Sequence, residues 1–132
     1  HIFRAILEAV IYGFKHHIDV LAEMGYTPGR IFATNGGSKS SFWCQIAADV
    51  LGAHVTSFPK HPGSALGVAF LAGVHAGVFQ DFEEIQKFLV SGAQEYDPIE
   101  ENAKICRKSY QIYRELYQEL RPSFAAVQRL YD

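Results

Sequence analysis

The sequence predicts an α/β fold that is rich in helix and contains a short parallel sheet. Two short apolar runs with the composition of buried strands flank a helical stretch, and this strand–helix–strand order is typical of a right-handed βαβ unit. Helical periodicities stand on both sides of that unit. With 132 residues, 48% hydrophobic content and a net charge of −2, the chain has enough apolar material for one compact domain.

The first predicted helix opens the chain and runs to about Met24. Its apolar residues recur at helical spacing: Phe3, Ile6, Leu7, Val10, Ile11, Phe14, Ile18 and Leu21. Gly25, with Pro28-Gly29 beyond it, is expected to end this helix. Because the pattern opens without a start methionine or a cap, we expect the chain to be a piece of a longer protein.

The predicted βαβ unit follows. Residues 30–34 and 54–58 are short runs rich enough in apolar and β-branched residues to form buried strands. The helix between them is traced by Phe42, Trp43, Ile46, Ala47, Val50 and Leu51. Residues 64–79 are apolar almost all round, which predicts a helix buried between other elements.

Two further helices are expected toward the end of the chain. Asp81 is placed to cap a helix over residues 81–89. A longer helix is traced by Cys106, Tyr110, Tyr113, Tyr117 and Leu120. Pro122 is expected to stop that helix, and the tyrosines from Tyr110 to Tyr131 are interpreted as a core stripe.

Composition argues against several function classes. The charge balance gives no basic surface of the kind that binds nucleic acid, and no run of about 18 apolar residues could span a bilayer. Cys44 and Cys106 fit no zinc or disulfide pattern, so a reducing, cytoplasmic location is the expectation. The adjacent His16 and His17 point about 100° apart on a helix and are not expected to share a metal.

The stretch IFATNGGSKSSFW, residues 31–43, is the most informative part of the chain. Asn35-Gly36 is a hairpin signal, but the downstream flank is helical. The Walker A pattern fails because Ser38, rather than glycine, precedes Lys39. What remains is a strand, a Gly-Gly bend and a helix start. Its N–H groups could face an anion or a nucleotide, or Ser38 or Ser40 could simply cap the helix.

A second glycine-rich segment, HPGSALGVAFLAG, covers residues 61–73. Gly63 and Gly67 bracket a helix start, and Ala65, Ala69 and Ala72 keep the surface of that helix small. Small residues permit close approach of another helix or loop, and tight packing is as good an interpretation as ligand contact.

Taken together, these segments resemble the C-terminal domain of the FGGY carbohydrate kinases, members of the actin, hexokinase and heat-shock ATPase superfamily. Residues 4–21, RAILEAVIYGFKHHIDVL, look like the family helix RAxxEGxxYxxR, and residues 35–52, NGGSKSSFWCQIAADVLG, look like its adenosine segment GGGxxSxxWxQxxADxxG. Residues 64–79 resemble ALGAAxLAxxxxGxF, and residues 109–124 resemble the closing YxxYxxLYPxLKxxF helix. The four segments occur in family order over nearly the whole chain.

The resemblance implies a ribonuclease H-like, actin-like ATPase fold in two lobes, with sugar and ATP bound between them. Residues 1–132 would be the C-terminal part of the second, nucleotide-binding lobe, and the upstream lobe would be absent. The nucleotide-binding residues would be Gly36, Gly37, Ser38, Ser41 and Phe42. The glycines would approach the ribose and α-phosphate, and Ser41 and Phe42 would lie near the adenine.

The sequence also departs from the family pattern. Asn35 stands where the family usually has its first glycine, Ser41 where proline is frequent, and Cys44 where arginine is. Asparagine tolerates positive φ, so the turn can survive this exchange. Trp43, Gln45 and Asp49 match the motif and are expected to pack and cap.

Catalytic residues are expected outside this chain. The family draws its catalytic aspartate, its sugar contacts and most of its Mg²⁺ contacts from upstream sequence, so we assign no catalytic residue here and expect no phosphoryl transfer by this chain alone. Asp19, Asp49, Asp81 and Asp97 are interpreted as helix, cap or turn residues. The expected ligands of the whole protein are ATP or ADP, Mg²⁺ and a sugar, with a pentulose favoured.

Alternatives remain from other classes. A non-catalytic interaction module derived from a kinase lobe would share the same motifs. A Rossmann half is disfavoured because no GxGxxG follows the first strand. Exposed sheet edges or an apolar patch could produce a homo-oligomer under either hypothesis.

Overall fold

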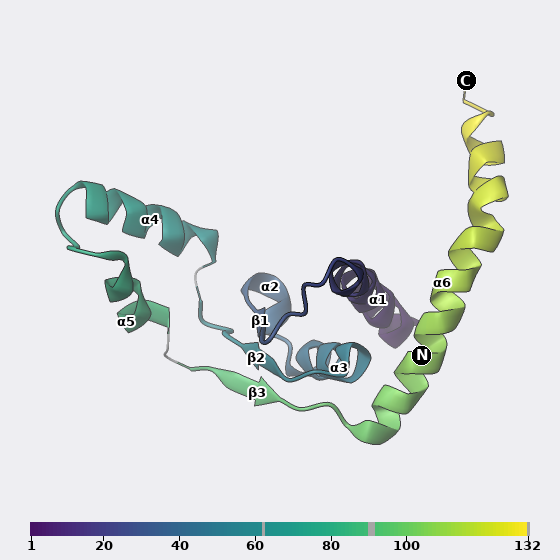
Figure 1. Ribbon diagram of the computed structural model, residues 1–132, viewed down its shortest axis with the longest axis horizontal. Helices are drawn as coiled ribbons and strands as arrows, with labels where there is room; N and C mark the ends of the chain where they lie inside the picture. Colours follow the sequence, from purple (N-terminus) through teal and green to yellow (C-terminus); the bar gives the residue numbers. More distant parts are fainter. Residues whose placement is uncertain (62, 90–91, 132) are drawn as a thin grey trace.

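The computed structural model describes residues 1–61, 63–89 and 92–131 (Figure 1). Its α-helices are α1 (Ile2–Glu23), α2 (Asn35–Ser38), α3 (Ser41–Leu51), α4 (Ser64–His75), α5 (Gln86–Leu89) and α6 (Glu100–Gln128), with a 3-10 helix η1 (Phe82–Ile85). The strands are β1 (Ile31–Ala33), β2 (Val55–Ser57) and β3 (Gln94–Tyr96). The helix-rich α/β prediction is therefore confirmed.

A small mixed sheet carries the predicted βαβ unit. The strand order is β1-β2-β3, with β1 and β2 parallel and Ile31 opposite Val55. Strand β3 pairs with β2 in the antiparallel sense, with Tyr96 opposite Val55. The third strand is absent from the sequence-based expectation because Gln-Glu-Tyr has no apolar alternation, and its pairing comes from the backbone.

The core lies where α1, α3 and α6 meet (Figure 1). Its buried members are Ile11, Tyr12, Ile46, Val50, Cys106 and Tyr110. Tyr110 also donates a hydrogen bond to Oδ2 of Asp19 at 2.7 Å, and burial raises the pKa of Tyr110 to about 12. Each large apolar side chain buried here contributes about 1.5–3 kcal/mol. This cluster holds the two longest helices against the βαβ unit.

The predicted helix over residues 64–79 exists as α4, but its predicted burial is wrong. Val68 is 67% exposed and Leu71 is 56% exposed, whereas Phe70 is buried. Together with η1 and α5, this helix forms an arm, residues 64–89, which extends away from the core (Figure 1). The described residues provide too few neighbouring elements to cover an all-apolar helix.

Packing inside the arm is aromatic. The Phe70 and Phe79 rings stack with centroids 4.5 Å apart, and a Cβ on Gly73 would lie 2.6 Å from the Phe79 ring. The predicted Asp81 cap is confirmed, because its Oδ1 accepts hydrogen bonds from the N–H groups of Glu83 and Glu84. The segment it starts is a 3-10 turn followed by one α-helical turn.

The C-terminal helix does not stop at Pro122, which lies inside α6. A proline there removes one hydrogen bond to the carbonyl of Gln118. Both residues are exposed, so water can satisfy that carbonyl and the helix continues to Gln128. The tyrosine stripe is only partly a core stripe, since Tyr110 is buried but Tyr117 and Tyr131 are exposed. None of the described helices is long and apolar enough to cross a membrane.

Candidate functional site

The loop that joins β1 to α3 has the predicted strand–turn–helix geometry. Asn35 adopts a left-handed conformation with φ of 66°, which confirms that asparagine can replace glycine at this turn. Residues 35–38 form the single turn α2. Ser40 then caps α3, because its Oγ accepts a hydrogen bond from the Trp43 N–H at 3.3 Å. The loop is therefore not a hairpin.

Ser38 is buried on the inner side of the loop. It is 1% exposed, and its Oγ lies 2.8 Å from the carbonyl oxygen of Asn35 and 3.3 Å from that of Phe58, the residue that follows β2. Cys44 Sγ lies 3.8 Å from the carbonyls of Gly37 and Ser38, and burial raises the pKa of this thiol. The structure thus places Ser38 under the loop, fully engaged by its own chain.

The two glycines of the loop have different surroundings. A Cβ on Gly37 would lie 3.0 Å from the Trp43 ring, so this glycine is packed closely inside the chain. A Cβ on Gly36 would meet nothing within 4 Å. Gly36 therefore leaves its backbone open to a group from outside the described residues.

Two other predicted residues, Ser41 and Phe42, are exposed at the start of α3. Phe42 is 48% exposed, which is high for a large aromatic ring. The N–H groups of Ser41 and Phe42 lie in the first turn of α3, where intrahelical acceptors are lacking. The next two N–H groups have acceptors on Ser40: that of Trp43 donates to the Ser40 Oγ and that of Cys44 to the Ser40 carbonyl. Lys39 is exposed beside them.

The second glycine-rich segment meets the loop. Gly63 is the N-cap of α4, with φ of 70°, and a Cβ there would overlap with Oδ1 of Asn35. Its N–H donates to Nδ1 of His61 at 2.9 Å. The close approach predicted for this segment is therefore a packing contact between Gly63 and Asn35 of the β1–α3 loop. Gly67, by contrast, has open space where its Cβ would be.

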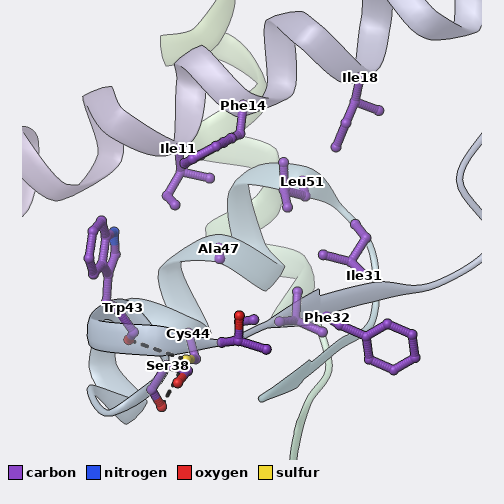
Figure 2. Close-up of a pocket in the computed structure, with 14 residues that line it drawn as sticks. Ile11, Phe14, Ile18, Ile31, Phe32, Ser38, Trp43, Cys44, Ala47 and Leu51 are labelled. Atoms are coloured by element: carbon purple, nitrogen blue, oxygen red, sulfur yellow. Dashed lines mark hydrogen bonds between the residues drawn. The ribbon is translucent and has the colours of Figure 1, made fainter. Parts of the chain in front are cut away.

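An apolar cavity of about 470 Å³ lies on the other side of the loop, between α1, β1 and α3 (Figure 2). Figure 2 shows Ile11 and Phe14 of α1 on one side and Ala47 of α3 on the other. Few polar groups reach it, and Trp43 Nε1 donates instead to the carbonyl of Leu7 at 3.3 Å. Its lining resembles a core surface, and it lacks the donors that a phosphate requires. Nothing in the sequence marks this cavity, because its lining residues match ordinary core positions.

Asp49 has the predicted capping role. Its Oδ1 accepts a hydrogen bond from the Ile99 N–H at 2.8 Å, and its Oδ2 accepts one from Asn102 Nδ2 at 2.9 Å. Gln45 donates to Oδ1 as well, at 3.0 Å. Since Ile99 is the N-cap of α6, this buried carboxylate joins α3 to the start of α6.

His54 has acidic partners that sequence analysis missed. Its Nδ1 lies 2.7 Å from Oδ1 of Asp97, and its Nε2 lies 2.5 Å from Oε2 of Glu95. Hydrogen bonds with Asp97 and Glu95 raise the pKa of His54, and bonds from Thr56 and His54 lower the pKa of Glu95. Both carboxylates come from β3 or its end, so the unpredicted strand explains the omission.

Comparisons with known proteins agree on one family. Residues 1–76 match the FGGY family of carbohydrate kinases, C-terminal domain. The chain is 26% identical over 117 residues to the xylulose kinase of Bacillus subtilis, covering 89% of this chain and 23% of that protein. It is 32% identical over 121 residues to the ribulokinase of Vibrio parahaemolyticus, covering 90% of this chain and 21% of that protein.

Solved structures give the same result. The xylulose kinase structure from Rhodospirillum rubrum matches 95% of this chain and 25% of its own length, with a TM-score of 0.75 and 33% identity. That from Lactobacillus acidophilus matches 94% of this chain and 25% of its own length, with a TM-score of 0.78 and 27% identity. The chain thus spans about a quarter of the length of these relatives. It has the fold of sugar kinases of the actin-like ATPase class, and it belongs to the FGGY family of carbohydrate kinases.

Proposed function

We propose that residues 1–132 form the nucleotide-binding C-terminal part of the second lobe of an ATP-dependent carbohydrate kinase. The observation that carries this proposal is the outward surface of the β1–α3 loop in a chain of this family. Gly36 leaves its backbone open there, and Ser41 and Phe42 are exposed at a helix start. Family membership supports the reaction class.

The five proposed nucleotide-binding residues divide into two groups. Gly36, Ser41 and Phe42 would touch the nucleotide, with N–H groups and the helix dipole facing a phosphate or ribose oxygen and the Phe42 ring facing the base. Gly37 and Ser38 would hold the loop in shape, since Gly37 packs against Trp43 and Ser38 is buried. This division differs from the prediction, which had both Gly36 and Gly37 approach the nucleotide and counted Ser38 among the nucleotide-binding residues.

ATP, when bound, would supply the γ-phosphoryl group that passes to a sugar hydroxyl. The residues of this chain would bind and orient the adenosine end. The described aspartates serve elsewhere: Asp49 and Asp81 cap helices, Asp19 accepts from Tyr110, and Asp97 contacts His54. We therefore assign neither Mg²⁺ nor catalysis to these residues and propose that the chain alone transfers no phosphate.

For the sugar, we propose a pentulose. Several relatives are named xylulose kinase or ribulokinase, and they align over most of this chain. A glycerol kinase from Limosilactobacillus reuteri is 35% identical over a shorter stretch of 99 residues, so a polyol is the second candidate. Parallel assays of the parent kinase with xylulose, ribulose and glycerol would test this choice.

Binding of MgADP to this chain, followed by Trp43 fluorescence, tests the nucleotide site. Trp43 packs against the loop and is the chain's only tryptophan. We expect a saturable change that Gly36→Val abolishes. The matched control is Gly67→Val, which also enters open space in the first half of a helix and should bind like the wild type.

Normal binding by Gly36→Val would contradict the proposed site. A wild-type chain without a saturable signal up to millimolar MgADP would show that these residues alone do not form the site. Repeating the same pair of variants in the parent kinase would then decide whether Gly36 contacts the nucleotide at all.

A further inference from the structure

The first turn of α3 holds the inner side of the β1–α3 loop through two neighbouring residues, Trp43 and Cys44. We call this pair the clamp. Successive residues on a helix point about 100° apart, so the two side chains reach different parts of the loop. Trp43 contacts Gly37, and Cys44 contacts the carbonyl oxygens of Gly37 and Ser38. Neither clamp residue belongs to the proposed nucleotide-binding set.

Cys44 satisfies a buried carbonyl group of the loop. Its Sγ lies 3.8 Å from the carbonyl oxygen of Ser38, and both residues are almost fully buried. Among the described residues, no backbone N–H donates to this carbonyl, whereas the Gly37 carbonyl also accepts from the Ser40 N–H at 3.2 Å. Figure 2 shows Ser38 and Cys44 side by side, with hydrogen bonds of the thiol dashed. Without the thiol, the Ser38 carbonyl would be buried and unpaired, which is costly.

The thiol has the protonation state that this contact requires. Burial raises the pKa of Cys44, and the neighbouring Ser57 hydroxyl of β2 offsets only part of that rise. Ser57 is fully buried, and its Oγ forms no hydrogen bond of normal geometry among the described residues. Cys44 therefore keeps its S–H at neutral pH and donates it to the loop, rather than acting as a reactive thiolate.

Trp43 joins the loop to α1. Its indole Nε1 donates a hydrogen bond to the carbonyl of Leu7 at 3.3 Å, and its backbone N–H donates to the Ser40 Oγ. The ring is thus held both at its backbone and at its indole nitrogen. Because a Cβ on Gly37 would lie only 3.0 Å from this ring, the ring limits the positions that Gly37 can adopt.

Together, these contacts restrict the loop to one shape. Each peptide unit is planar, so holding the carbonyls of two successive residues, Gly37 and Ser38, fixes the orientation of both peptide units. Gly36, whose backbone is open, comes directly before this fixed part. Every contact of the clamp lies between described residues, so it does not depend on the rest of the relatives' length.

We propose that Trp43 and Cys44 are positioning residues that hold the β1–α3 loop in the shape that binds a nucleotide. The inference rests on the proposed function, and it adds that nucleotide affinity depends on groups that do not touch the ligand. When the clamp is weakened, only a fraction of the molecules keeps the binding shape. The apparent dissociation constant then rises as the inverse of that fraction.

Isothermal titration calorimetry of the parent kinase with MgADP tests the clamp, because it gives both a dissociation constant and a number of sites. We expect Cys44→Ala to raise the dissociation constant about tenfold, since the Ser38 carbonyl loses its donor. Serine is close to alanine in size but keeps a donor, so Cys44→Ser should stay within about twofold of the wild type. Trp43→Phe lacks the indole N–H and should raise the constant about fivefold.

Cys106→Ala is the matched control. Cys106 is as deeply buried as Cys44, but it lies in the core where α1, α3 and α6 meet. This variant should bind MgADP like the wild type. A variant that simply misfolds would show fewer sites with an unchanged dissociation constant, whereas loss of positioning raises the constant and keeps the number of sites.

Pulsed alkylation with iodoacetamide tests the same link in the wild-type kinase. Cys44 and Cys106 are both free and buried, so each reacts only when its surroundings open. A bound nucleotide stabilises the closed loop. We therefore expect MgADP to slow alkylation of Cys44 by a larger factor than alkylation of Cys106.

The outcomes separate this inference from the proposed site. Cys44→Ala or Trp43→Phe binding MgADP like the wild type, or Cys44→Ser binding as weakly as Cys44→Ala, would overturn the inference and leave the proposed site standing. Equal slowing of alkylation at the two cysteines would do the same. Normal binding by Gly36→Val would instead contradict the proposed site, and the inference would be wrong with it.

Discussion

The core of α1, α3 and α6 and the arm of α4, η1 and α5 have similar apolar content but different fates. In the core, Ile46 is 1% exposed and the polar groups of Asp49 and Ser38 are satisfied by the chain itself. In the arm, α4 is more apolar than any of the three core helices, yet its Val68 and Leu71 side chains are exposed. Apolar composition predicts that burial of a surface is favourable, but the neighbouring elements decide whether that surface is buried.

The largest expected difference between core and arm is in cavity formation. Ile46→Ala should lower the free energy of unfolding by about 2–5 kcal/mol, because it removes a fully buried side chain from the core. Phe70→Ala, at a buried site in the arm, should change the global transition by less than about 1 kcal/mol, since the arm can open separately. Urea denaturation followed by circular dichroism measures both. Equal losses would show that arm and core unfold as one unit.

The two capping aspartates give the next largest contrast. Asp49→Ala leaves the Ile99 N–H and the Asn102 amide without their buried acceptor, and we expect a loss of about 2–3 kcal/mol. Asp81→Ala removes an exposed cap in the arm and should cost about 0.5–1 kcal/mol. Thermal melting of both variants would rank them, and a larger effect at Asp81 would be inconsistent with the separation of core and arm.

The neighbouring glycines sharpen the comparison within the loop. Gly37→Ala pushes a methyl group against the Trp43 ring and should destabilise the chain by about 1 kcal/mol while shifting Trp43 emission. Gly36→Ala enters open space and should be neutral or slightly stabilising. Urea titrations read by Trp43 fluorescence would check this order. If Gly36→Ala destabilised the chain more than Gly37→Ala, the identification of Gly37 as the packed glycine would be wrong.

The smallest expected effect is the pH dependence of the β2–β3 pairing. The raised pKa of His54 means that its contribution is fully present below the unfolded value, about 6.5, and is lost as pH rises through the folded value. We expect the β3 amides, after correction for intrinsic exchange rates, to lose a little hydrogen-exchange protection between about pH 6 and pH 8. In His54→Gln this change should disappear; its persistence would assign the pH dependence to another group.

The sequence predicted the parts of the fold that have local signals. The α1 periodicity, the strand and helix runs of the βαβ unit and the Asp81 cap can each be recognised from a single continuous stretch of residues, and the structure confirms them. Strand β3 was not predicted because Gln94–Tyr96 has no apolar alternation. Its pairing with β2 joins residues far apart in the sequence, such as Thr56 and Glu95, which are 39 residues apart. The His54 contacts with Glu95 and Asp97 escaped for the same reason.

Prediction of the candidate site was limited by side-chain packing. The motif identified the loop, but it could not separate Gly36 from Gly37, because only the position of the Trp43 ring distinguishes them. Likewise, nothing in the sequence shows that the Ser38 hydroxyl turns inward to the carbonyls of Asn35 and Phe58. The prediction that Pro122 stops the helix was wrong because Pro122 and Gln118 are both exposed, so water can satisfy the carbonyl that the proline leaves without a donor.

The most direct test of the central claim is a nuclear magnetic resonance titration of the chain with MgADP. We predict saturable shifts of the Gly36, Ser41 and Phe42 amides, with smaller shifts at Gly37 and Ser38 and none at Gly67 in the arm. Shifts that fall on the arm or on the lining of the apolar cavity, while the amides of Gly36, Ser41 and Phe42 stay unchanged, would contradict the assignment of the β1–α3 loop as the nucleotide site.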